Sequence, residues 1–188
     1  MTIRLSPARV SPGLLLALIL ALCAALIPVT GHAATIKDFV GAYEGEAEVI
    51  VDGAPLKRDM SVTIAPTKEG FTLSWTSATH REDGRIKEKT YSIGFVPSAR
   101  DNIYQSAMKT NLFGKATPLD PLQGEPFVWA RIEGETFSVF SLFIDPAGDY
   151  EVQEFHRTLA PGGLDLLFRR VREGTVEREI RTLLRRKD

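Results

Sequence analysis

The stretch 71–76 reads Phe-Thr-Leu-Ser-Trp-Thr and alternates apolar and polar side chains throughout. Strict alternation over this length indicates a β-strand with one face on a core and the other toward solvent. The same period recurs at 43–51, 60–64 and 91–95. The Asp83-Gly84 pair separates two of these runs, and it is typical of tight hairpins because glycine adopts the positive φ that they need. The sequence therefore predicts successive antiparallel strands around this stretch.

The pattern continues toward the C-terminus after one interruption. Further alternating runs, each followed by turn residues, lie at 103–108, 127–132, 137–144, 150–159 and 164–171. The interruption is the stretch Lys109 to Pro126, rich in glycine and proline, which we expect to be a long loop and a candidate ligand gate. The tail, 175–188, has apolar spacing that fits a helix or a strand. Glu173-Gly174 resembles one more hairpin turn and favours a final strand.

These observations predict one all-β domain. No long helical pattern separates the strands, so parallel crossover connections are not expected. A meander of this size must protect its edges, and closure into a barrel does so. We therefore predict an up-and-down antiparallel β-barrel of about eight to ten strands, with an open sandwich as the alternative. A barrel of this size either fills with side chains or encloses one small ligand.

The N-terminus has the pattern of a secretory signal peptide. Arg4 and Arg9 precede an unbroken apolar run from Leu14 to Ile27. This run has 14 residues, fewer than the roughly 20 that cross a bilayer core. A basic start, a short apolar stretch and a small-residue exit are typical of a cleaved export signal.

Gly31 and Ala33 are small residues at the positions that favour cleavage before Ala34. We expect residues 1–33 to be a signal peptide and 34–188 to be a single exported domain, periplasmic if the source is a bacterium. The only cysteine, Cys23, lies in the signal, so the mature domain has no disulfide. Removal of the signal leaves 21 basic and 24 acidic residues. This balance gives no reason to expect a nucleic-acid partner.

The residues 39–43, Phe-Val-Gly-Ala-Tyr, resemble the Phe-x-Gly-x-Trp signature that opens the first strand of lipocalins and the wider calycin group. Asp149-Tyr150 is similar to part of a second lipocalin motif. The expected strand count is also similar to that of ten-stranded fatty-acid-binding or nitrobindin-type barrels. The resemblance implies a binder of a small apolar molecule. It also implies that a late basic residue covers Tyr43, for which the candidates are Arg169, Arg170 and Arg172.

Aromatic side chains are distributed over the expected strands, and some must face the barrel interior. The predicted ligand-binding residues are Trp75, Tyr91, Trp129, Phe140 and His156. The two tryptophans are the first candidates for a pocket wall, because indole joins bulk to a hydrogen-bond donor. Nitrobindin-type barrels hold haem iron through one histidine, which makes His156 the candidate axial ligand. No second feature supports haem, and we expect no cofactor.

Nine basic residues gather late in a nearly neutral domain: Arg157, Arg169, Arg170, Arg172, Arg178, Arg181, Arg185, Arg186 and Lys187. They predict a solvated face or, as the functional alternative, peripheral contact with an anionic membrane surface. No zinc spacing and no Gly-x-Ser-x-Gly elbow occurs, so no metal and no catalytic residue is predicted.

The sequence favours an exported calycin-like barrel that binds or carries a small lipophilic molecule. The second reading is a cell-envelope interaction or assembly protein with a filled barrel. An enzyme acting on an apolar substrate is third, because few reactive side chains remain in the mature domain. The sequence does not predict the oligomeric state.

Overall fold

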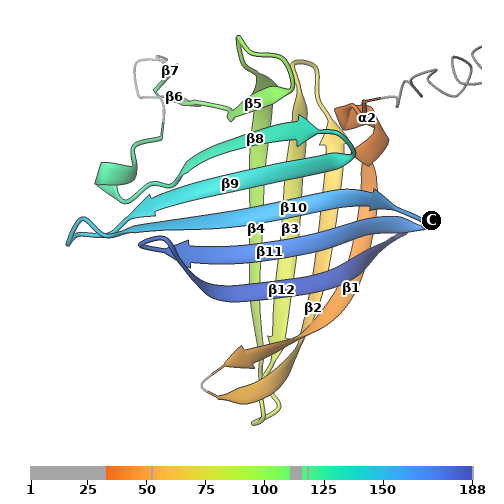
Figure 1. The fold of residues 1–188 in the computed structure, drawn as a ribbon, viewed down its shortest axis with the longest axis vertical. Coiled ribbons are helices and arrows are strands. Elements are labelled where there is room, and N and C mark those ends of the chain that lie inside the picture. The colour runs from red at the N-terminus through yellow and green to blue at the C-terminus, as the bar shows by residue number, and fades with distance from the viewer. Residues whose placement is uncertain (1–32, 52, 111–115, 118, 188) are drawn as a thin grey trace, which may run out of the picture. The chain divides into compact units, whose positions relative to one another are not determined.

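The computed structural model describes residues 33–51, 53–110, 116–117 and 119–187. Ten strands close into one antiparallel barrel, as the sequence predicted. They are β1 (Gly41–Val51), β2 (Ala54–Pro66), β3 (Phe71–His80), β4 (Ile86–Pro97), β5 (Ile103–Ser106), β8 (Phe127–Glu133), β9 (Thr136–Ile144), β10 (Tyr150–Ala160), β11 (Gly163–Arg172) and β12 (Thr175–Arg186). Each strand pairs with its neighbours in the chain, and β1 pairs with β12 to close the ring. In Figure 1, β8–β12 cross steeply over β2–β4.

The sequence left two alternatives, a helix or a strand, for the tail at 175–188. The tail forms β12, which pairs with β11 along almost its whole length. Glu173 and Gly174 have φ angles of 48° and 77° and form the hairpin turn between the two strands. A register shift between Arg170 and Val171 marks an irregularity in this pairing. Irregularities of this kind redirect side chains at strand ends.

The barrel wall is thinnest between β4 and β8. Only Phe95, Val96 and Pro97 of β4 pair with β5, and β5 itself is four residues long. The expected long loop follows, and its described parts are β6 (Lys109–Thr110), β7 (Ala116–Thr117) and the short 3-10 helix η1 (Pro121–Gln123). Within the described residues, the edge of β4 from Ile86 to Ile93 has no second strand partner.

One end of the barrel is filled by apolar side chains. The short helix α2 (Ile36–Phe39) packs against this end and begins with a capping box between Thr35 and Asp38. Phe39 and Phe137 are fully buried, and their ring centroids lie 5.7 Å apart. Phe71 lies 5.5 Å from Phe137, in an edge-to-face arrangement. The rest of this cluster includes Tyr43, Val62, Ile64, Leu73, Phe95, Val128, Ala130, Val139, Leu164 and Leu184.

Tyr43 is covered by a basic residue, but not by one of those that the resemblance suggested. The guanidinium of Arg186 lies 5.4 Å from the Tyr43 ring centroid and donates to its hydroxyl over 3.1 Å. A second Arg186 nitrogen donates to the Val40 carbonyl over 2.6 Å. Arg169, Arg170 and Arg172 were the wrong candidates, because β12 and not β11 is the neighbour of β1. Arg186 is paired directly with Tyr43 across that seam.

The expected signal peptide, residues 1–33, lies almost entirely outside the described residues. Its cleavage point remains a prediction. The described chain starts beside that point, where Ala34 is buried and donates its backbone N–H to the Gly134 carbonyl over 3.2 Å. None of the helices in the described ranges has the length and apolar character needed to cross a membrane.

Candidate functional site

The half of the barrel away from α2 is hollow. It encloses a cavity of about 720 Å³, which falls in the size range of small-molecule sites. The walls come from β1–β4 on one side and β10–β12 on the other. Four aromatic residues contribute to the lining: Trp75, Tyr91, Phe155 and Phe168. Several inward-facing positions at this end carry polar side chains, such as Ser77 and Thr79, whereas the filled end has an apolar cluster.

The aromatic residues form two connected pairs across the cavity. Trp75 stacks on Tyr91 with ring centroids 5.0 Å apart, and it lies 5.7 Å from Phe155. Phe155 in turn contacts Phe168 at 4.9 Å. These contacts join β3 and β4 to β10 and β11 through the interior, and they give the cavity an apolar wall that suits a lipophilic ligand.

Arg157 lies where the filled half meets the cavity. It is 1% exposed and lines the cavity, although β10 could have placed an apolar residue there. Its guanidinium lies 5.5 Å from the Phe155 ring centroid and 6.0 Å from that of Phe137. Two of its nitrogens, Nε and Nη1, have no acceptor among the described protein residues. Burial lowers the pKa of Arg157 to about 10, so the side chain is still charged at neutral pH.

Arg58 from β2 and Arg178 from β12 also line the cavity. Arg58 donates through Nε to the Thr79 hydroxyl over 2.8 Å. Burial and the nearby Arg178 charge both lower the pKa of Arg58. The cavity lining as a whole holds seven basic residues and two acidic ones, Glu82 and Asp83. The residues Arg81, Lys87, Lys89, Glu82 and Asp83 of this lining are exposed. The positive potential deeper in the cavity comes from Arg58, Arg157 and Arg178, because Glu177 pairs with Arg170.

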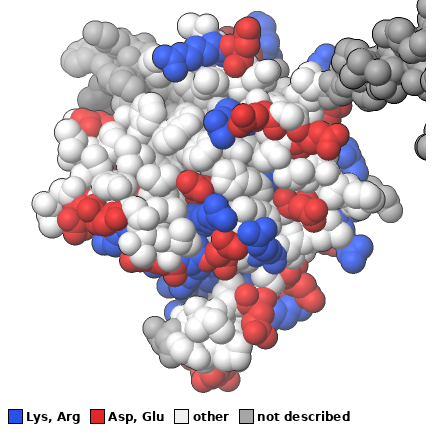
Figure 2. All heavy atoms as spheres, viewed as in Figure 1, with Lys and Arg blue, Asp and Glu red and all other residues white. Residues whose placement is uncertain are grey.

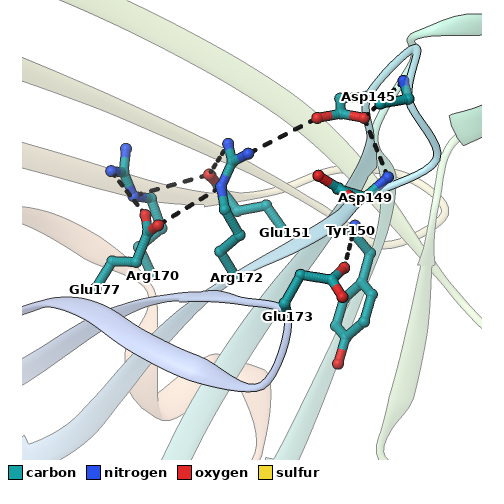
Figure 3. Close-up of polar contacts among 9 residues, drawn as sticks. Asp145, Asp149, Tyr150, Glu151, Arg170, Arg172, Glu173 and Glu177 are labelled. Carbon is teal, nitrogen blue, oxygen red and sulfur yellow. Dashed lines mark hydrogen bonds and ion pairs between the residues drawn. The ribbon is translucent and has the colours of Figure 1, made fainter.

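The arginines of β11 near the cavity are different, because carboxylates already pair with them (Figure 3). Arg170 lines the cavity, and its Nη2 lies 3.0 Å from Glu177. Its Nε is 3.8 Å from Glu151, which is close enough for an ion pair but too long for a hydrogen bond. Arg172 pairs with Glu151 at 3.4 Å and with Asp145 at 3.7 Å. This network ties the ends of β10, β11 and β12 together and neutralises the cations there.

The five predicted ligand-binding residues separate into two groups. Trp75 and Tyr91 line the cavity and contact each other. Trp129, Phe140 and His156 are absent from its lining, because they alternate with inward-facing neighbours and lie on the outer wall. There they form a cluster of their own, with Trp129 stacked on Phe140 at 5.1 Å and Phe140 edge-on to His156 at 5.7 Å. His156 is therefore not directed at any ligand, including haem, that the cavity would hold.

His156 also belongs to a chain of polar contacts that resembles a catalytic triad. Its Nδ1 lies 2.9 Å from the Ser138 hydroxyl and its Nε2 lies 3.2 Å from Glu154. Ser138, however, is 4% exposed and lies mid-strand, paired on both sides, so the backbone N–H groups near it serve the sheet. An oxyanion needs donors that are free to meet it. The contacts order the outer wall of β9 and β10 and do not form a reaction site.

The late basic residues do not act as one surface. Arg157, Arg170 and Arg178 face the interior, while Arg186 covers Tyr43. Arg169 and Arg181 both pair with Glu179 on the outside. On the face drawn in Figure 2, acidic and basic side chains are interspersed over β10–β12. Contact with an anionic membrane remains a prediction, and fewer of these residues are left to make it.

Sequence reasoning missed the most unusual residue of the site. Arg157 was counted among the surface cations, although it alternates with Phe155 and Leu159 in the same run. The other face of that strand, with Val152 and His156, is equally mixed in polarity, so its period does not tell which face is inside. The pairing of Arg157 with Phe137 and Leu166, both buried, settles its orientation.

No cluster of three or more His, Cys, Asp or Glu side chains suited to a metal occurs within the described residues. No model of a known protein family matches the chain, and no curated protein matches it in sequence.

Proposed function

We propose that the domain is a calycin-like barrel that binds one small lipophilic molecule in its open half. The observation that supports this proposal most directly is the cavity of about 720 Å³, which has an aromatic wall between β3–β4 and β10–β11. A barrel selected only for stability gains most from filling its interior, because each buried apolar side chain contributes about 1.5–3 kcal/mol. In this barrel one half is filled with apolar side chains and the other half is not. An unfilled interior of this kind is typical of a binding protein.

The same proposal includes export. The apolar run Leu14–Ile27 and the small residues before Ala34 support transport of the barrel out of the cytoplasm, with the periplasm as its location in a bacterium. A carrier of a poorly soluble molecule is useful between two membranes, where water separates the source from the destination. N-terminal sequencing of the secreted product tests this part, and a start at Ala34 is the expected result.

Binding is tested with the neutral dye N-phenyl-1-naphthylamine, whose fluorescence rises in an apolar site. Ser77 lines the cavity, so Ser77→Phe should fill part of it and weaken binding at least ten-fold. Ser74 is the matched control: it is on the same strand, faces outward and contacts the Ser92 hydroxyl at 2.8 Å. Ser74→Phe should leave the affinity unchanged. Absence of a saturable signal with the wild-type protein, or equal effects of the two variants, would contradict the proposal.

The second candidate function is interaction with another component of the cell envelope. The observation in its favour is the outer aromatic cluster of Phe127, Trp129 and Phe140, in which Phe127 is 42% exposed. This second function does not require the cavity. It predicts that Ser77→Phe keeps the biological function of the protein while substitution of Trp129 removes it, the opposite of what the carrier reading predicts.

A further inference from the structure

The outer wall over β8 and β9 carries a continuous apolar patch. The outer aromatic cluster of Phe127, Trp129 and Phe140 forms its centre, with successive ring centroids 5.8 Å and 5.1 Å apart. Leu142 pairs across the strands with Phe127, which is 42% exposed, and extends the patch along β9. Figure 2 shows mainly uncharged atoms over the half of β8 and β9 nearest η1. Single exposed apolar residues are common on protein surfaces, whereas a contiguous patch indicates a binding surface.

This patch has the composition of the centre of a protein–protein interface. Such centres are rich in tryptophan, phenylalanine and arginine and poor in lysine and glutamate. Arg131 belongs to the same face, with its guanidinium 5.7 Å from the Phe140 ring centroid. Its ion pair with Glu133 is exposed and therefore weak. The core of the barrel does not require the patch, because Val128 and Ala130 on the inner face of β8 are the residues buried there.

Two opposite charges flank Phe140, one on each neighbouring strand. Arg131 lies on β8 with its side chain 48% exposed, and Glu154 on β10 is the direct cross-strand neighbour of Phe140. The Glu154 carboxylate contacts His156 at 3.2 Å, and no lysine or arginine of the described ranges pairs with it. Its other cross-strand neighbour, Arg169, is paired with a different carboxylate. The patch therefore has a basic side on β8 and an acidic side on β10.

We infer that this patch binds the same patch of a second copy of the chain, in a twofold dimer centred near Phe140. With the twofold axis along the strands, β8 of one copy lies over β10 of the other. Arg131 then meets Glu154 across the interface, and the symmetry repeats this contact. An anionic membrane would instead favour a patch with basic residues on every side. The aromatic cluster does not line the cavity, so the inference is independent of the proposed ligand binding.

The size of the patch sets the expected strength of the dimer. Three strands at the usual spacing give a width of about 10 Å. A standard interface of about 800 Å² per partner is roughly three times as broad, so the association should be weak. A twofold contact also closes on itself, so no oligomer larger than a dimer is expected.

Sedimentation equilibrium of the wild-type protein measures this association directly. The expected result is a monomer–dimer equilibrium with a dissociation constant of about 1–100 µM. Trp129→Ser removes the centre of the patch and should weaken dimerisation at least about ten-fold. A wild-type protein that stays monomeric at concentrations well above this range would overturn the inference and leave the patch to a different component of the envelope.

Charge reversal tests the twofold arrangement itself. Arg131→Glu places two carboxylates at each contact and Glu154→Arg places two guanidinium groups there, so each variant alone should dimerise at least about ten-fold more weakly. A mixture of the two variants should regain the wild-type affinity, because every contact in the mixed dimer again joins opposite charges. Lys57→Glu is the matched control, since Lys57 is exposed and pairs with Glu46 on the outer face of β1 and β2. It should leave dimerisation unchanged.

The remaining outcomes separate this inference from the proposed function. Wild-type affinity in Arg131→Glu would place the dimer contact on another surface, and a variant mixture that stays monomeric would exclude the twofold arrangement. Either result overturns the inference. The charge variants change side chains that are at least partly exposed, so they test it even if Trp129→Ser fails to fold. A monomer that binds the neutral dye would leave the proposed function standing, whereas a dimer that binds no dye would leave only this inference.

Discussion

The two ends of this barrel share strands β1–β4 and β10–β12 but differ in what fills them. At the α2 end, Phe39, Phe71 and Phe137 meet in contacts of 5.5–5.7 Å and leave no exposed surface. At the other end these strands surround a cavity of about 720 Å³. Under the proposed function, one end supplies most of the stability and the other gives up part of it for a binding site.

The largest effect is expected from a matched pair of core substitutions. Phe71→Ala removes a ring that contacts Phe95, Tyr104 and Phe137, and it should lower the free energy of unfolding by about 3–5 kcal/mol. Phe168→Ala removes a ring that already borders the cavity and contacts Phe155, and it should cost about 1–2 kcal/mol. Urea denaturation measures both. Equal losses would show that the open half carries as much stability as the filled half.

Arg157→Met should stabilise the free protein on the order of 3 kcal/mol, because it removes a buried charge without an acidic partner. The pKa of Arg157 is lowered from its ordinary value to about 10, so the folded state carries this cost at every pH below that value. Between pH 10 and the ordinary arginine pKa, the folded protein releases the proton first, and the difference between the two proteins should narrow as pH rises. Thermal unfolding across this range measures it. A loss of stability at neutral pH would mean that Arg157 has a structural partner.

Arg186→Met tests how the filled end is closed. The variant loses hydrogen bonds to the Tyr43 hydroxyl and the Val40 carbonyl, and the expected loss in the free energy of unfolding is about 1–2 kcal/mol. Burial raises the pKa of Tyr43 and the Arg186 charge opposes that rise, so the substitution should raise the Tyr43 pKa further. Ultraviolet titration of the phenolate provides the readout. An unchanged titration would place the arginine away from the ring in solution.

The smallest effects are expected on the outer wall. His156→Ala removes contacts with Ser138 and Glu154 that do not reach the cavity. It should leave the affinity for N-phenyl-1-naphthylamine unchanged within error, whereas Trp75→Ala should weaken it several-fold. The dye titration that tests the proposed function also measures these variants. A clear loss of dye binding in His156→Ala would contradict the division between inner and outer residues.

The sequence predicted the strands better than the faces. Alternation and turn dipeptides indicated the meander and the Glu173-Gly174 hairpin, because those signals are local. Closure followed from the need to protect the edges of a sheet of this size. Both faces of β9 and β10 carry apolar and polar residues, and the outer face of β8 holds Phe127 and Trp129 beside Arg131, so Trp129 and Phe140 looked as suitable for the interior as Trp75. Their orientation depends on the register with neighbouring strands, which no local pattern contains. The cavity could not be predicted from the sequence either, because it depends on α2 and the phenylalanines packing at one end of the barrel only.

The central claim, that ligand binds in the open half, is tested most directly by the two tryptophans of the chain. Trp75 lines the cavity, while Trp129 lies on the outer wall. Their indole N–H signals in a ¹H–¹⁵N correlation spectrum can be assigned with Trp75→Phe and Trp129→Phe. On addition of N-phenyl-1-naphthylamine, the account predicts a saturable shift of the Trp75 signal and none of the Trp129 signal. A shift of Trp129 alone, or no shift of either signal, would contradict it.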